Sequence, residues 1–154
     1  MTNNDLLRRI RYIFDFKDAK MVAVFALTGQ QISREQISNW LRKDDDPAFE
    51  KCSDTDLSFF LNGLISDLRG KQEGVSVAPE SELNNNIIFR KLKIALDLKA
   101  DDIVEIMRQS KVNISKHELS AFFRKPGHRH YRDCLDQILR NFLNGLQLKY
   151  RGLP

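Results

Sequence analysis

The sequence contains an internal repeat. Residues 4–70 align with residues 86–152, 82 positions further on, without a gap, and 20 of the 67 aligned pairs are identical. The block Phe-Leu-Asn-Gly-Leu occurs at residues 60–64 and again at 142–146. Self-similarity of this kind indicates tandem copies of one structural unit. It predicts one copy at residues 4–70, a second copy at residues 86–152 and a linker at residues 71–85.

Apolar residues follow helical spacing in both copies. The pattern predicts four helices per copy, because apolar residues recur three and four positions apart and form one buried face on each helix. Ser33 and Ser115 each precede a predicted third helix, with Gln36 and Glu118 three residues later, as in a capping box. The apolar stripe of the fourth helix extends to Leu68 in the first copy and to Tyr150 in the second. No segment alternates with a period of two, so we expect no sheet.

The predicted linker lacks apolar periodicity and contains glycine, proline and serine. A unit of 67 residues is short, and a domain of this size buries only about 60% of its unfolded surface. We therefore expect an all-α fold in which two four-helix repeats pack on each other about a pseudo-two-fold axis. Two independent units on a flexible linker are the alternative.

Composition narrows the class of protein. No stretch reaches the roughly 20 apolar residues of a membrane span, and the N-terminus lacks the pattern of a secretory signal. We expect a cytoplasmic protein with no membrane partner. The two cysteines, Cys52 and Cys134, are far apart in the sequence and have no CxxC partner, so neither a disulfide framework nor a four-ligand zinc site is indicated.

The repeated motifs resemble a known family. The opening segment 4–12, the segment 60–65, the Arg69-Gly70 pair and their counterparts in the second copy are similar to the YehS-like bacterial proteins. These are two-copy members of domain of unknown function 1456. The resemblance spans nearly the whole chain. It implies a small, helical, cytoplasmic bacterial protein and transfers no catalytic residue.

We predict no catalytic residue. Cys52 and Cys134 are the only reactive side chains shared by the copies, and nucleophilic catalysis also needs a base and an orienting group. The first copy has no histidine to serve as that base. Both cysteines are therefore interpreted as small buried residues.

One histidine-rich segment raises the question of a metal. His128, His130 and Cys134 lie close together in the sequence, and His117 precedes them. The residues that align with these three histidines in the first copy are not histidines, so no such site is duplicated. A closed metal site also needs about four well-spaced ligands. We therefore predict neither a metal site nor a cofactor.

Other identities between the copies are interpreted as structural. A glycine inside a helix costs about 1 kcal/mol relative to alanine, so its repetition indicates close helix packing, with the neighbouring asparagine bonded to backbone. The repeated aspartates are expected to cap the fourth helices or to lie in their first turns. These residues are Asn62, Gly63, Asn144, Gly145, Asp54 and Asp136.

Charge is distributed unevenly between the copies. Residues 4–70 carry 10 Lys and Arg against 11 Asp and Glu, whereas residues 86–152 carry 14 against 7. The first copy has three consecutive aspartates, residues 44–46, where the second copy is basic. Basic clusters can bind phosphates. The candidate nucleic-acid contacts are Lys116, Arg124, Lys125, Arg129 and Arg132.

A helix-turn-helix is only half matched. The spacing of Ile32, Ile37 and Trp40 resembles the spacing that seats a recognition helix. However, Leu27 stands where a small residue is expected at the helix crossing, and Gln109 takes that place in the second copy.

Two functions follow as expectations. The first is a non-enzymatic binding protein whose partner is a protein or a second copy of the chain, with the acidic first repeat docking on the basic second repeat. The alternative is nucleic-acid binding through the basic second repeat, with mainly electrostatic contacts.

Overall fold

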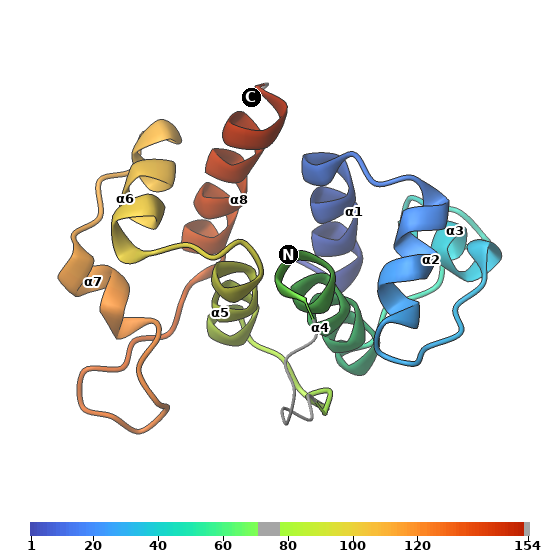
Figure 1. Cartoon of the computed structure of the whole chain (residues 1–154), viewed down its shortest axis with the longest axis horizontal. Helices are drawn as coiled ribbons and strands as arrows, with labels where there is room; N and C mark the ends of the chain where they lie inside the picture. Colours follow the sequence, from blue (N-terminus) through green and yellow to red (C-terminus); the bar gives the residue numbers. More distant parts are fainter. Residues whose placement is uncertain (71–77, 153–154) are drawn as a thin grey trace. The chain divides into compact units, whose positions relative to one another are not determined.

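The computed structural model describes residues 1–70 and 78–152, which form eight helices and no strand (Figure 1). The prediction of an all-helical chain with two tandem repeats is confirmed. The chain divides into two compact units, Met1–Leu83 and Asn84–Pro154. Their predicted pseudo-two-fold packing stays a prediction.

The first unit contains four helices, α1 (Asn3–Phe14), α2 (Asp18–Ala26), α3 (Arg34–Leu41) and α4 (Asp54–Arg69). Helices α1 and α2 each pack against both α3 and α4. Apolar residues at helical spacing fill the space between them, because burial of one face stabilises each helix far more than its own propensity does. The largest fully buried side chains of this unit include Phe25 and Phe60.

The second unit repeats the order with α5 (Asn85–Ala95), α6 (Ala100–Gln109), α7 (Lys116–Ala121) and α8 (Asp136–Arg151). Helix α8 packs against α5 and α6, and α6 also packs against α7. Helix α7 has six residues, whereas its counterpart α3 has eight.

The predicted serine caps of the third helices are present, but the predicted capping box is complete only in the second unit. The Gln36 side chain donates to the Glu50 carboxylate at 2.8 Å and does not return to the start of α3. The Ser33 hydroxyl accepts a hydrogen bond from the Gln36 amide at 3.1 Å. Ser115 and Glu118 make both bonds of a capping box, at 3.0 and 3.3 Å. These bonds satisfy amides that have no partner within the helix, which fixes where α3 and α7 begin.

The repeated glycines lie where two helices touch. A Cβ on Gly63 of α4 would be 2.1 Å from the Val24 carbonyl oxygen of α2, and a Cβ on Gly145 of α8 would be 2.3 Å from the Ile106 carbonyl oxygen of α6. Only glycine allows a backbone approach this close. The predicted packing role of the glycines is therefore what the geometry shows. The bonding of the neighbouring asparagines stays a prediction, and Asn62 is buried whereas Asn144 is exposed.

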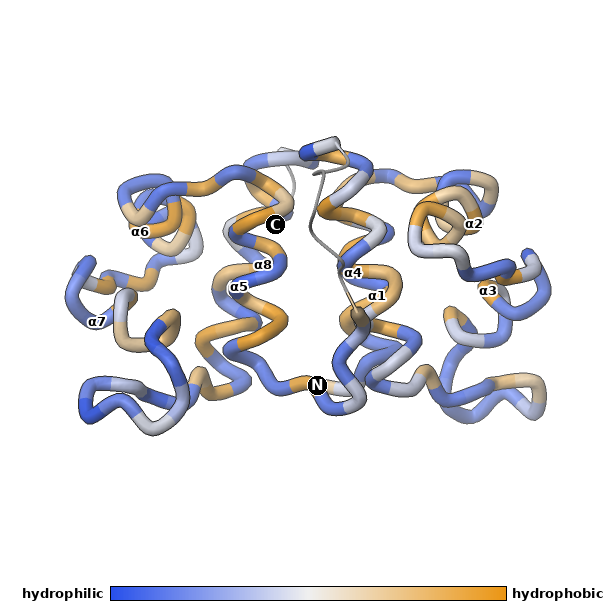
Figure 2. Tube along the Cα trace, turned by 60° about the horizontal axis from the view of Figure 1, so that its bottom comes forward, coloured by the Kyte–Doolittle hydropathy of each residue, from blue (hydrophilic) through white to orange (hydrophobic). Residues whose placement is uncertain are grey.

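The apolar stripes differ from prediction at their ends. Figure 2 shows apolar and polar residues alternating along α4 and α8. Leu68 and Tyr150, expected on the buried faces, are 45% and 42% exposed. Both lie in the last turns of their helices, beyond the crossings at Gly63 and Gly145. The prediction that the buried face extends this far was wrong.

The predicted linker falls partly outside the described residues, since residues 71–77 are not described. Its end is bound to the first unit. The Leu83 amide donates to the Asp54 carboxylate at 2.9 Å, and the Glu80 amide donates to the buried Ser58 hydroxyl at 3.0 Å. No helix in the described part of the chain is both long and apolar enough to cross a membrane.

Candidate nucleic-acid interface

A buried asparagine near the start of each unit holds a long surface loop. Asn4 is 1% exposed, and its amide nitrogen donates to the carbonyl oxygens of Trp40 at 2.9 Å and Glu50 at 2.8 Å. Its side-chain oxygen accepts from the Cys52 amide at 3.0 Å. One side chain therefore joins the two ends of the segment between α3 and α4.

The second unit repeats this arrangement atom for atom. The Asn86 amide nitrogen donates to the carbonyl oxygens of Phe122 at 3.1 Å and Arg132 at 2.8 Å. Its oxygen accepts from the Cys134 amide at 2.9 Å. Buried polar groups need such partners because an unpaired group costs about 1–3 kcal/mol. The loop that follows α7 is thus held at both ends (Figure 1).

Neighbouring asparagines add a second repeated attachment. Asn3 donates to the Cys52 carbonyl at 3.1 Å and to the Asp54 carboxylate at 2.7 Å. Asn85 makes the corresponding bonds to Cys134 at 2.9 Å and Asp136 at 2.7 Å. Asp54 and Asp136 lie in the first turns of α4 and α8, where a negative charge interacts favourably with the helix dipole.

In the loop of the first unit, which we call the acidic loop (residues 42–50), two of the aspartates lie beside an arginine. Arg42 lies 3.4 Å from the Asp46 carboxylate, and Arg8 of α1 lies 3.4 Å from the Asp44 carboxylate. Arg8 also donates to the Arg42 carbonyl. Two of the three consecutive aspartates therefore have a cationic neighbour within the unit.

The loop of the second unit, which we call the basic loop (residues 124–132), has no such pairing. Its charged side chains are exposed, and none of them forms an ion pair within the described residues. Figure 2 shows this loop, beside α7, as mostly hydrophilic. The cations concerned are Arg124, Lys125, Arg129 and Arg132.

The fifth candidate contact behaves differently. Lys116, at the start of α7, lies 2.6 Å from the Asp101 carboxylate of α6. Four of the five candidate residues therefore lie together on the basic loop, and Lys116 lies outside it with its charge paired.

Helices α6 and α7 depart from a helix-turn-helix. That motif joins its two helices by a turn of three or four residues, whereas residues 110–115 separate α6 from α7. The half-matched apolar spacing therefore reflects packing within the unit, where Ile114, Leu119 and Phe122 are buried.

The histidines and cysteines do not converge. His117, His128 and His130 are exposed, whereas Cys134 is buried. Among the residues that the structure describes, no group of three or more His, Cys, Asp and Glu side chains could hold a metal ion.

The two thiols are held in the protonated form. Burial raises the pKa of both Cys52 and Cys134 from 9.0 to about 12, assisted by the carboxylates of Asp56 and Asp54 in the first case and of Asp136 in the second. The nucleophile is the thiolate, and at neutral pH these thiols stay protonated.

Slow thiol labelling is therefore expected. At about pH 8, a chromogenic disulfide reagent should modify Cys52 and Cys134 much more slowly in the folded protein than in guanidinium. An added cysteine at the exposed position of Arg140 should react at once. Because the folded pKa is raised, the stability contributed by the neutral thiols should be present below about pH 9 and be lost toward pH 12. Labelling of the native thiols as fast as the Arg140→Cys control would contradict this placement.

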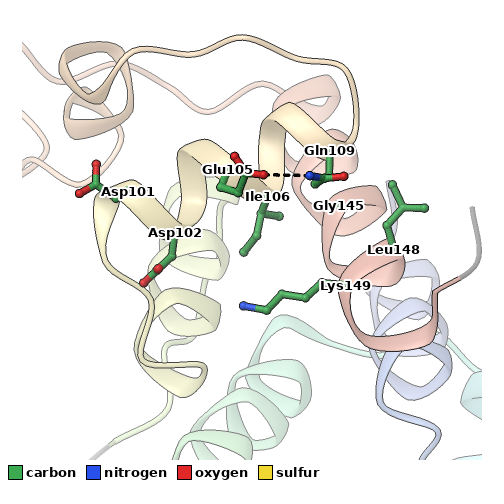
Figure 3. A pocket seen from close by; sticks show the side chains of 8 residues that line it. All are labelled: Asp101, Asp102, Glu105, Ile106, Gln109, Gly145, Leu148 and Lys149. Atoms are coloured by element: carbon green, nitrogen blue, oxygen red, sulfur yellow. Dashed lines mark hydrogen bonds between the residues drawn. The ribbon is translucent and has the colours of Figure 1, made fainter.

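A groove lies between α6 and α8 of the second unit (Figure 3). It has a volume of about 410 Å³, and Gly145 of the repeated block lines it. Its acidic groups already have partners: Asp101 pairs with Lys116, Asp102 accepts the Lys99 amide at 2.8 Å, and Glu105 accepts two bonds from Arg108. In Figure 3 the Lys149 side chain extends toward Asp102.

The corresponding place in the first unit carries the opposite arrangement of charge. Lys20 of α2 lies 2.8 Å from Asp67 of α4, and their repeat partners are Asp102 and Lys149. The exchange keeps one cation and one anion across the helix pair. We interpret the groove as a consequence of close glycine packing with its polar groups occupied.

Sequence reasoning missed the asparagines. Asn4 and Asn86 are one of the identical pairs of the repeat, and extension of the alignment by one residue adds Asn3 and Asn85. An asparagine repeated at the start of a helix, within one turn of buried apolar residues, was the available signal. Its partners could not be identified because they lie 36 to 48 residues further along the chain.

The fold and the two loops define a duplicated helical protein in which identical scaffolds carry loops of different charge. The chain belongs to the family described as "Protein of unknown function (DUF1456)", whose model matches residues 3–70 and 85–152. It is 45% identical over 147 residues to "Uncharacterized protein YehS" of Escherichia coli (strain K12), covering 95% of this chain and 94% of that protein. The family resemblance is thus confirmed. No solved structure matches the chain.

Proposed function

We propose that the chain is a non-enzymatic binding protein that binds nucleic acid through the basic loop. One observation carries the proposal: the two units hold equivalent loops by the same asparagine bonds, yet Arg42 of the acidic loop lies beside Asp46, whereas none of the four cations of the basic loop forms an ion pair within the described residues. Side chains that only maintain the fold would not need four uncompensated cations on one loop, and such a cluster attracts phosphates.

The backbone of the basic loop supports a fixed presentation of these cations. The Arg132 amide donates to the Ala121 carbonyl at 3.2 Å, and the His128 amide donates to the Lys125 carbonyl at 3.0 Å. A loop with held ends loses less conformational entropy on binding than a free segment does. The cations therefore lie on a preorganised surface that an anionic partner can bind.

Docking of the acidic repeat on the basic repeat, within or between chains, is the competing function. It requires the aspartates at residues 44–46 to be available. Arg8 and Arg42 already lie beside two of them, which lowers the negative potential of the acidic loop. This observation favours nucleic acid over self-association as the partner.

Salt dependence tests the proposal. Binding of a labelled oligonucleotide, followed by fluorescence anisotropy, should weaken by about 50- to 150-fold between 50 and 200 mM salt if four phosphates are neutralised. The double variant Arg124→Glu/Lys125→Glu should lose at least about tenfold in affinity, and reversal of all four cations should abolish binding.

The repeat supplies a matched control. Arg42 and Lys43 occupy the same positions in the first unit, so Arg42→Glu/Lys43→Glu changes the net charge equally. Salt screens the effect of a distant charge, so a change in net charge away from the interface should matter little. The Arg42→Glu/Lys43→Glu variant should therefore bind within about threefold of the parent. Equal losses in the two doubles would overturn the basic loop as the interface. A concentration-dependent dimer in light scattering, lost on reversal of Asp44, Asp45 and Asp46 to lysine, would support the competing function instead.

A further inference from the structure

We infer that the nucleic acid bound by the basic loop is single-stranded, with its bases stacking on the rings of His128, His130 and Tyr131. This inference rests on the proposed function and specifies its ligand. The sequence of the loop interleaves rings and cations without interruption from His128 to Arg132. Unpaired bases are recognised in this way, by aromatic or guanidinium planes beside a charged track.

Turns bring the rings of the loop to the surface. Gly127 adopts a φ of 90°, and the Tyr131 amide donates to the His128 carbonyl at 2.9 Å. The rings of His128 and His130 are exposed and lie 5.6 Å apart, centroid to centroid, at 40° to each other. Two neighbouring planes near this separation can offer successive stacking positions.

Contacts within the loop orient these rings. The His130 amide donates to Nδ1 of His128 at 3.0 Å, and Arg129 Nε donates to Nε2 of His130 at 3.1 Å. Tyr131 is half-buried, and its hydroxyl is hydrogen-bonded to the Asp133 side chain. One ring nitrogen of each histidine is thus bonded within the loop, which fixes the orientation of the exposed ring.

The second unit does not present a helix suited to duplex DNA. A recognition helix places the residues of its first turns against base edges in the major groove. Helix α7 has six residues, a length of about 9 Å. In its first turn Lys116 is paired with Asp101, and Glu118 closes the capping box. The binding groups therefore lie on an irregular loop, which suits a flexible strand.

The first unit supports the assignment by contrast. The repeat partners of His128 and His130 are Asp46 and Ala48, and the partner of Tyr131 is Phe49. The partners of Arg129 and Arg132 are Pro47 and Glu50, whereas Arg124 and Lys125 recur as Arg42 and Lys43. The two histidines and two of the four cations are thus replaced together on the acidic loop. Joint replacement is expected if both kinds of side chain serve one ligand.

Three probes test the inference at about pH 8. They are a labelled oligothymidylate of about a dozen nucleotides, a hairpin duplex of the same length and polyphosphate, which has no bases. We expect the single strand to bind at least about tenfold more tightly than the duplex. Polyphosphate should compete with it poorly at equal phosphate concentration.

Ring variants separate stacking from charge. His128→Ala/His130→Ala should lower affinity for the single strand by about tenfold or more while leaving its salt dependence unchanged. His128→Phe/His130→Phe keeps the rings and should restore binding, which shows that loss in the alanine variant is not due to misfolding.

The outcomes distinguish the two proposals. Equal affinity for all three probes, with no effect of the alanine variant but loss on reversal of the four cations, would overturn the inference and leave the proposed function standing. Binding of none of the probes by the parent protein would overturn both.

Discussion

Replacement of Asn86 by alanine is expected to lower the free energy of unfolding of the second unit by about 3–5 kcal/mol. The substitution leaves the carbonyls of Phe122 and Arg132 and the amide of Cys134 without their side-chain partner. Each unsatisfied buried group costs about 1–3 kcal/mol. A small unit has a total stability of only about 5–15 kcal/mol, so a loss of this size should leave much of it unfolded at physiological temperature.

Denaturation followed by circular dichroism measures the loss. The control is Asn141→Ala, which removes one bond to Gln137 at the surface of α8 and should change stability by less than about 0.5 kcal/mol. Limited digestion with trypsin gives a second readout, because cleavage after the cations of the basic loop should accelerate once its ends are released. If Asn86→Ala and Asn141→Ala are equally stable, the asparagine does not hold the loop.

Alanine at Gly145 is expected to destabilise the same unit by about 1–2 kcal/mol. The added Cβ would lie 2.3 Å from the Ile106 carbonyl oxygen and 2.6 Å from an Ile106 side-chain carbon. Helix α6 cannot remove a backbone carbonyl by changing a rotamer, so the helices must separate. Overpacking of this kind costs about 1–3 kcal/mol, and the better helix propensity of alanine returns about 1 kcal/mol at most.

The position half a turn away in α8 provides the comparison. Gln147 is half-buried, and Gln147→Ala should be neutral or slightly stabilising, because alanine favours a helix. The melting temperature should therefore fall for Gly145→Ala and stay the same or rise slightly for Gln147→Ala. An unchanged melting temperature for Gly145→Ala would mean that α6 and α8 do not cross as closely as this glycine allows.

The elements that could be predicted are those specified by neighbours in the sequence. Ser33 and Ser115 cap helices because their hydroxyls reach amides three residues away. The packing role of Gly63 and Gly145 could be inferred because a glycine inside a helix destabilises it relative to alanine. Its presence in both copies therefore indicates a stabilising contact that only glycine permits. In each case the physical cause lies within one helical turn.

The elements that escaped prediction depend on distant partners. The roles of Asn4 and Asn86 involve backbone groups up to 48 residues further along the chain, and no local pattern identifies them. Asp15 and Asp97 are another identical pair, and both take left-handed backbone angles, with φ of 53° and 52°. Aspartate tolerates this region better than most residues, yet its presence alone does not predict such a turn.

The candidate interface was predicted by charge and corrected by geometry. Counting cations selected five residues, but the count could not show that Lys116 would be neutralised by Asp101 of α6. Nor could it show that Arg8 and Arg42 would offset the aspartates of the acidic loop. Charge pairing depends on tertiary distances, and composition contains none of them.

The asparagine bonds have a consequence for how such a protein can diverge. The hydrogen bonds by which Asn4 and Asn86 hold the two loop segments all join the asparagine side chain to main-chain atoms, and every residue type supplies a carbonyl. Side chains between the attachment points can therefore change freely while the helices stay as they are. Duplication gave this chain two such exchangeable segments, and one of them can acquire a new ligand while the other keeps its original character.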